Sequence, residues 1–261
     1  MMQGTFIFLG TGGSTGVPLI GCRCLICLSA SPFNKRWRAS GLIRLEQKTF
    51  LIDVGPDFRT QALHFGISKL DGVVLTHTHF DHIAGLDDLR ALCFWQKDKI
   101  PCLVSQDTLN ELKVRYHYLM QPHEGCGIPY ARLSFQVVAE DFGRALFQGQ
   151  EWRHVSYFQS GMKVTGYVVG DLAYISDIRE YSEEVTRSLS GVKTLILGAL
   201  RYAPSKGHFT IEEAIAFARR VGAEQTYLTH IGHELDHEET NQKLPPDIRL
   251  GYDGLEIFFE V

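Results

Sequence analysis

The sequence lacks several features that would place it in whole classes of protein. It has no apolar run approaching the ~20 residues that a membrane-spanning helix needs, and no linker, repeat or low-complexity segment. Its first residues do not join a basic region to an apolar one, so no signal peptide is evident. We therefore expect a single domain over residues 1–261, a cytoplasmic location and no membrane partner.

An excess of charge of one sign is also missing. The formal net charge is −4 and 21% of the residues are charged, which is ordinary for a globular protein. Residues 35–38 (KRWR) are the one tight basic run, and we interpret them as a solvated turn. A nucleic-acid partner is therefore not expected. The sequence does not fix the oligomeric state, and a homodimer stays open.

Cysteine is scarce and unevenly spread. Three of the six cysteines, Cys22, Cys24 and Cys27, lie close together. This spacing favours metal ligation in a reducing compartment over a disulfide framework. Three thiols are one ligand short of a closed tetrahedral zinc site, so a fourth ligand must come from elsewhere; three unligated thiols are the alternative.

The densest polar pattern is the stretch HTHFDH at residues 77–82, which follows a short apolar run at residues 70–75. The run predicts a buried strand that delivers the polar residues at its end. Imidazole and carboxylate at this density indicate divalent transition metals. Two ions are favoured over one, because four ligands on one short loop are hard to direct at a single ion. A solvated histidine-rich loop is the alternative. The ligand candidates are His77, His79, Asp81 and His82.

Further polar residues end other predicted strands. Asp53 closes a hairpin over residues 42–53, where it either holds a histidine ligand in place or is a simple turn residue. Asp177 ends a second hairpin over residues 164–177, and His230 follows the last core strand.

His208 precedes the clearest helix in the chain. Thr210 and Glu213 form a capping box at its start, so we assign Glu213 to capping and not to catalysis. A second helix is expected over residues 107–120, with Asp107 as its cap. Residues 248–259 predict a closing hairpin, and residues 121–127, which include His123, a loop.

The glycine-rich residues 10–16 permit a tight backbone path near a site, with direct phosphate contact as the weaker interpretation. Strands dominate the first half of the chain, and strands alternate with helices in the second. Two sheets with helices outside fit this order better than one open sheet, which places the chain in the α+β class.

Residues 77–82 resemble the His-x-His-x-Asp-His signature of the metallo-β-lactamase fold, and the resemblance covers nearly the whole chain. It implies an αββα sandwich of two mixed β-sheets with helices on the outer faces. Residues 10–18, 21–27, 228–233 and 251–257 are similar to the PhnP-like branch. That branch contains cyclic phosphodiesterases of phosphonate breakdown, which act on phosphoribosyl cyclic phosphate.

The resemblance also implies two divalent metal ions, Mn or Zn, and one structural zinc. His154 would be a core or surface histidine by itself and becomes a ligand through the resemblance alone, whereas His237 has no assignment. His208 matches the catalytic histidine of the family. The implied ligands are His77, His79, His154 and Asp177 for one metal; Asp81, His82, the bridging Asp177 and His230 for the other; and Cys22, Cys24, Cys27 and His233 for the structural zinc.

The resemblance implies a dinuclear-metal phosphodiesterase that acts on a small, cyclic ribose phosphodiester. Two cations sharing a carboxylate lower the pKa of a bridging water, and the resulting hydroxide attacks phosphorus. His208 would protonate or stabilise the leaving oxygen, and Asp81, besides being a ligand, could accept a proton from the water.

Two alternatives are a transfer-RNA 3′-processing endonuclease, although no long basic arm is present, and a non-catalytic metal- or cofactor-binding relative. The chain departs from the family pattern over residues 93–153, so the substrate is not fixed.

Overall fold

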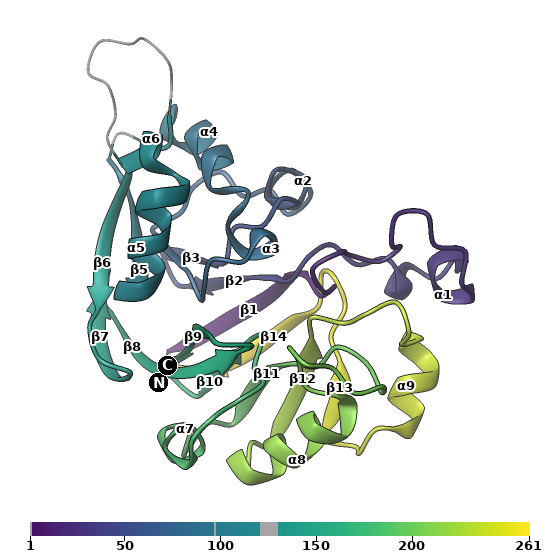
Figure 1. Ribbon diagram of the computed structural model, residues 1–261. Helices are drawn as coiled ribbons and strands as arrows, with labels where there is room; N and C mark the ends of the chain where they lie inside the picture. Colours follow the sequence, from purple (N-terminus) through teal and green to yellow (C-terminus); the bar gives the residue numbers. More distant parts are fainter. Residues whose placement is uncertain (1, 97, 121–129) are drawn as a thin grey trace.

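The structure is a computed structural model that describes residues 2–96, 98–120 and 130–261. In this part of the chain the strands form two seven-stranded sheets (Figure 1). From edge to edge, the first sheet contains β14 (Glu256–Glu260), β1 (Gln3–Gly10), β2 (Ser40–Leu45), β3 (Lys48–Ile52), β4 (Gly72–Val74), β5 (Ile100–Ser105) and β6 (Leu133–Val138). The second contains β13 (Ile248–Leu250), β12 (Gln225–Thr229), β11 (Thr194–Gly198), β10 (Leu172–Ile175), β9 (Met162–Val169), β8 (Gln150–Gln159) and β7 (Phe142–Phe147).

Helices connect the strands and lie on the outer sides of both sheets (Figure 1). Those of the first half are α1 (Leu25–Leu28), α2 (Phe58–His64), α3 (Phe80–Ile83), α4 (Arg90–Cys93), α5 (Gln106–Arg115), α6 (His117–Met120) and the 3-10 turns η1 (Pro32–Asn34) and η2 (Leu86–Leu89). Those of the second half are α7 (Glu183–Ser188), α8 (Ile211–Val221) and α9 (His237–Lys243). The predicted α+β sandwich is confirmed. Within the described residues, no helix has the length and apolar character that crossing a bilayer requires.

Side-chain alternation along the strands divides the apolar residues between separate cores. On β1, Phe6 and Phe8 enter the core between the sheets, whereas Ile7 and Leu9 enter the core under the helices. Aromatic contacts join the two sheets in the inner core. The ring of Trp152 on β8 lies 5.3 Å from that of Phe50 on β3, at an interplanar angle of 76°.

The second sheet also supports the segment that follows β4. Tyr167 on β9 donates from its hydroxyl to the carbonyl oxygen of Leu75 at 3.1 Å. The amide of Thr165 donates to the carbonyl oxygen of Thr76 at 2.9 Å. The backbone immediately before His77 is therefore fixed by the opposite sheet.

Three local predictions are wrong, and one lies outside the described residues. Residues 35–38 are not a solvated turn, because Arg36 is buried and donates to Thr11 Oγ1 and to the carbonyl oxygen of Gly251. Residues 248–259 do not form a hairpin, because β13 pairs in parallel with β12 in one sheet and β14 pairs antiparallel with β1 in the other. The cap of α5 is Ser105, whose side chain accepts from the amide of Thr108, and not Asp107. The predicted loop at residues 121–127, with His123, lies outside the described residues.

The capping box of α8 is confirmed. The side chain of Thr210 accepts from the amide of Glu213, and Glu213 accepts from the amide of Thr210. Gly222 ends the helix with a φ of 77°, a left-handed conformation that glycine adopts without steric cost.

Replacing Trp152 by alanine tests the contact between the sheets. Trp152 is 1% exposed, and the loss of a buried aromatic side chain of this size lowers the free energy of unfolding by about 3–5 kcal/mol. Trp95→Ala is the matched control, because Trp95 is 82% exposed and its removal is expected to change stability by less than about 0.5 kcal/mol. Denaturant unfolding of both variants measures the difference, and equal losses would contradict the assignment.

Candidate metal centre

Two groups of histidine and aspartate side chains share one carboxylate, that of Asp177. Within each group the ligand atoms all lie within 4.8 Å of one another. The side chains come from strand ends of both sheets: the segment after β4 with α3, the end of β10 and the end of β12. The first group is His77, His79 and Asp177, and the second is Asp81, His82, Asp177 and His230.

Asp53 orients two of the histidine rings. His82 Nδ1 lies 2.7 Å from Asp53 Oδ2 and donates its proton there, while His82 Nε2 has no hydrogen-bond partner among the described residues. Thr76 Oγ1 also donates to Asp53 Oδ2, and His77 Nδ1 lies 2.9 Å from that hydroxyl. Both rings therefore turn Nε2 and its lone pair toward the groups, as metal ligands do. These contacts favour the holding role of Asp53 over that of a turn residue.

Three of these strand-end residues have a left-handed backbone. The φ angles are 60° at Asp53, 48° at Asp177 and 58° at His230. Such conformations cost about 1–3 kcal/mol each for a residue other than glycine, and they concentrate at functional sites. Here the turn away from the strand direction brings each side chain into the space between the sheet ends.

The buried charges of the groups require a positive counterpart. Burial by itself would raise the pKa of Asp177, yet His230 and His82 hold it well below its usual value. Burial would lower the pKa of His82, but Asp177, Asp81 and Asp53 raise it well above its usual value. Carboxylates this deeply buried are stable only with cations beside them. With His82 Nε2 at 3.3 Å from Asp81 Oδ2 and 3.5 Å from Asp177 Oδ1, this donor set fits two divalent metal ions.

His208 lies beside the groups, on their accessible side. Its ring stacks on that of His230 at 4.6 Å, and its Nδ1 is 3.9 Å from Asp177 Oδ2. The side chain is 16% exposed, whereas that of His230 is fully buried. Burial lowers the pKa of His208 to about 4, and the charge of His230 adds to the shift. The ring is thus neutral near pH 7 and can donate a hydrogen bond.

The structure does not bring His154 to this centre, and its prediction as a ligand is wrong. His154 stands opposite Gly143 on β7 and lines a surface hollow with Arg144, Arg153 and other residues away from both groups. Its spacing in the sequence suited the family order, but its place along β8 does not reach the strand end.

Gln159, the last residue of β8, reaches the centre instead and was missed. Its Nε2 donates to Asp177 Oδ2 at 3.0 Å. An amide is not a usual ligand and belonged to no motif. The available signal was its position at a strand end just before the Ser160–Gly161 turn, where the other site residues also occur.

A third group contains the clustered cysteines. Cys22, Cys24, Cys27 and His233 offer ligand atoms within 4.8 Å of one another, so His233 supplies the expected fourth donor. The amide of Cys27 and the ring of His233 bond to Cys24 and lower its pKa to about 6, whereas burial raises that of Cys27 to about 11. A thiolate is the ligand form of cysteine.

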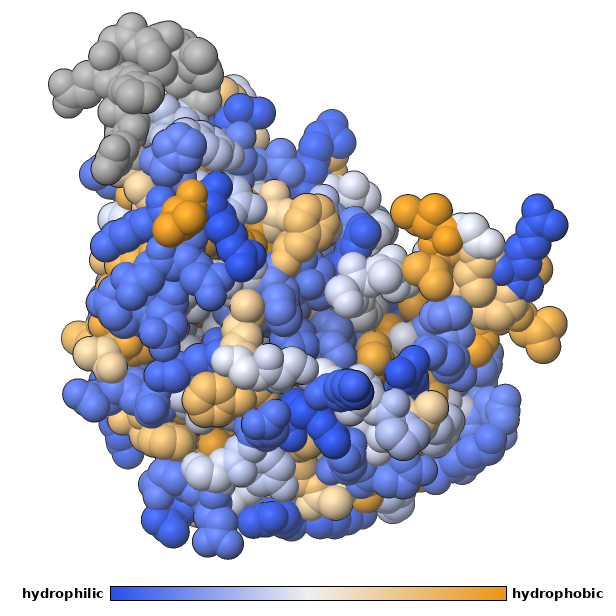
Figure 2. All heavy atoms as spheres, in the orientation of Figure 1, coloured by the Kyte–Doolittle hydropathy of each residue, from blue (hydrophilic) through white to orange (hydrophobic). Residues whose placement is uncertain are grey.

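This group lies on the projecting segment that carries α1 (Figure 1). The segment exposes Ile20, Leu25 and Leu28, and apolar side chains gather there in Figure 2.

Two further sequence features have structural roles. The amides of Gly12 and Gly13 donate to the carbonyl oxygens of Trp37 and Ile231, so the glycine-rich loop packs by its backbone and these amides are not free for phosphate. His237, unassigned from the sequence, stacks on Phe33 at 4.8 Å and lies 3.1 Å from the guanidinium of Arg36.

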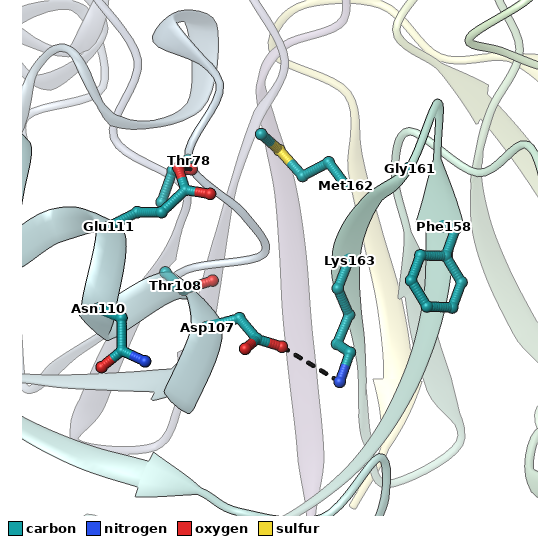
Figure 3. A pocket seen from close by; sticks show the side chains of 9 residues that line it. All are labelled: Thr78, Asp107, Thr108, Asn110, Glu111, Phe158, Gly161, Met162 and Lys163. Atoms are coloured by element: carbon teal, nitrogen blue, oxygen red, sulfur yellow. Dashed lines mark hydrogen bonds and ion pairs between the residues drawn. The ribbon is translucent and has the colours of Figure 1, made fainter.

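A cleft of about 390 Å³ lies next to the histidine motif, between α5 and the β8–β9 hairpin (Figure 3). Thr78 points into it and donates to Glu111 on α5. Since successive side chains of an extended segment alternate, Thr78 points away from His77 and His79. None of the residues lining the cleft belongs to the three groups, so its contacts anchor the motif and take no part in ligation.

Comparison with known proteins identifies the family in which this arrangement of residues occurs. Residues 48–231 match the Beta-lactamase superfamily domain. A solved structure described as a new diphosphatase from the PhnP family is 36% identical to this chain, with a TM-score of 0.91, and the match covers 100% of this chain and 98% of that one. The chain belongs to the β-lactamase superfamily and, within it, to the PhnP family. It is a metal-dependent hydrolase.

Two other relatives are more distant or longer. Zn²⁺-bound PqqB from Methylobacterium extorquens is 19% identical, with a TM-score of 0.76, and the match covers 97% of this chain and 99% of PqqB; this likeness concerns the fold alone. A protein of Porphyromonas gingivalis (strain ATCC BAA-308 / W83) named octanoyltransferase is 37% identical over 257 residues. The match covers 97% of this chain and 51% of that protein, so the chain spans about half the length of this relative.

We expect Asp53→Asn to weaken metal binding at the centre about 10- to 100-fold, because the variant no longer accepts from His82 Nδ1 with a charged oxygen. Competition of the variant and the natural protein with a chelating dye measures the change. Asp98→Asn is the control, since Asp98 is exposed. Unchanged affinity in Asp53→Asn would show that the ring of His82 needs no such support.

Proposed function

We propose that this chain hydrolyses the phosphodiester or diphosphate linkage of a small phosphorylated molecule, with a cyclic ribose phosphodiester as the first candidate. The observation that carries the proposal is the carboxylate of Asp177, which both metal-binding groups share and which lies 3.9 Å from His208. Two ligand groups side by side suit a phosphate held by two oxygens. The likeness to a PhnP-family diphosphatase supports chemistry at phosphorus and adds the diphosphate linkage to the candidates.

Each side chain then has a definite role. The two groups would hold divalent ions, Mn or Zn, which would supply polarisation of the phosphate oxygens and a lowered pKa of water. His208 donates its ring N–H to the leaving oxygen from the accessible side of the centre. Although burial raises the pKa of Asp81, His82 and His230 lower it far below its usual range. Asp81 is thus a weak proton acceptor, and we assign it to metal ligation first.

The alternative activities receive less support. A formal net charge of −4 does not attract a polyanion such as transfer RNA. The name octanoyltransferase belongs to a relative about twice as long, and acyl transfer is not carried over to a chain that covers 51% of it. Because both sheets supply ligands, we propose that residues 1–261 act as one hydrolase domain in a reducing compartment such as the cytoplasm. A homodimer stays open.

Replacing His208 by alanine tests the proposed chemistry. We expect the variant to bind both metal ions with unchanged stoichiometry and to lose about 10²- to 10³-fold in turnover, the range for loss of one hydrogen-bond donor to developing negative charge. A chromogenic phosphodiester, a cyclic ribose phosphate and a dinucleoside diphosphate are the substrates, each with added Mn, with added Zn and after chelation.

His117→Ala is the matched control, because His117 is exposed on α6. Full turnover in His208→Ala would remove His208 from the mechanism. Absence of turnover on all three substrates, with both metal positions filled, would overturn the proposed function in favour of a binding protein or an ester hydrolase.

We also propose that the third group holds a structural zinc. Cys24→Ser is then expected to lose one equivalent of zinc and to make the segment around α1 more sensitive to protease, while the Mn content of the centre stays unchanged. Metal analysis and limited proteolysis measure both effects. Cys102→Ser, a buried cysteine outside the group, is the control, and equal zinc content in all three proteins would contradict the assignment.

A further inference from the structure

We infer that Gln159 stands where the first metal position would have its fourth protein ligand, and that this position is consequently the weaker and more readily exchanged of the two. The inference rests on the proposed function only in that both need a dinuclear centre. The four-ligand set expected from the family is complete at the second position. At the first, His77, His79 and Asp177 are joined by no further histidine, cysteine or acidic side chain among the described residues.

The contacts of Gln159 place it at the centre. Its side chain is buried, and its Nε2 lies 3.0 Å from Asp177 Oδ2 and 3.1 Å from His208 Nε2. Its Oε1 is buried and has no hydrogen-bond partner among the described residues. A buried amide oxygen without a donor is poorly stabilised. A half-turn of the amide that exchanges Nε2 for Oε1 would bring this oxygen to Asp177, where a cation at the first position would be its partner.

An amide and an imidazole differ in which metal ions they prefer and in how tightly they bind them. A neutral amide oxygen is a hard and weak ligand, which suits Mn²⁺ or Mg²⁺, whereas imidazole suits Zn²⁺ and other transition ions. Asp81 contributes a second carboxylate to the other position, so the formal charge there is more negative. Both differences lower the affinity of the first position relative to the second, and most strongly for zinc.

The geometry also gives Gln159 a second effect, on His208. The same amide N–H₂ reaches both Asp177 and the ring of His208, so it ties that ring to the shared carboxylate. A ligand histidine in its place would turn its nitrogen toward the metal and release this tie. With its nitrogen toward Asp177, Gln159 is thus a positioning residue for His208; as a metal ligand it would turn its oxygen there instead.

Titration with Mn²⁺ tests the inference without a substrate. The full-length protein, with zinc left on the cysteine group, is titrated with Mn²⁺, and free Mn²⁺ is counted from its sharp electron paramagnetic resonance signal. We expect two binding events whose dissociation constants differ at least tenfold in the natural protein. Gln159→His should tighten the weaker event by about 10- to 100-fold, which is the scale on which changes around metal ligands act, and should leave the tighter one unchanged. When the titration is repeated with Zn²⁺, the dissociation constants of the two events should differ by a larger factor in the natural protein.

Two further variants keep the test decisive. Gln159→Glu has nearly the same shape and adds a charged ligand, so it too should tighten the weaker event, even if a histidine does not fit at this position. Gln136→His places a histidine at an exposed glutamine of β6 and should change neither event. Equal affinities in the natural protein, or a weaker event that neither substitution at position 159 tightens, would overturn the inference. Unequal binding in a protein that hydrolyses none of the phosphate substrates would support the inference while the proposed function fails.

Discussion

The carboxylate of Asp177 is the contact on which the rest of the site depends. Its two oxygens lie near His77, His82 and His230 at 3.3–3.6 Å, and these rings come from strand ends in both sheets. Because the group is buried, its charge would be prohibitively unfavourable in an apolar core. The two sheets must therefore meet at a position where cations bind, and the packing between them cannot shift without separating the ligands.

The residues around Asp177 keep its histidine neighbours in fixed positions. Asp53 sets the rings of His77 and His82 through direct and hydroxyl-mediated hydrogen bonds, and β9 fixes the backbone that precedes them. The left-handed backbone of Asp53, Asp177 and His230 costs free energy that the packed sheets compensate. The chain therefore places rigid, strained strand ends around its metals, as a hydrolase needs when the positions of charge must not change during the reaction.

Much of the site could be predicted from the sequence, because its signals are local. Residues 77–82 combine an apolar run with ligand spacing, and Asp177 and His230 follow apolar strands in the same way. The choice between His154 and Gln159 could not be made, since it depends on where β8 ends, and strand ends predicted from periodicity are in error by about 2–4 residues. The hairpin predicted over residues 248–259 is wrong for a related reason. Alternation identifies strands but carries no information about their partners, and here the two strands pair in different sheets.

The pairing of β1 has a consequence for the order in which the first sheet forms during synthesis. One edge of β1 pairs with β2 soon after it in the sequence, while the other pairs with β14, so that Gln3 faces Glu260. During synthesis this edge of β1 stays unpaired until residues 256–260 have left the ribosome. Contacts this distant in sequence form slowly, and an unpaired strand edge can associate with other chains in the meantime. Pairing with β14 thus covers this edge of β1 and makes β14 the edge strand of the first sheet.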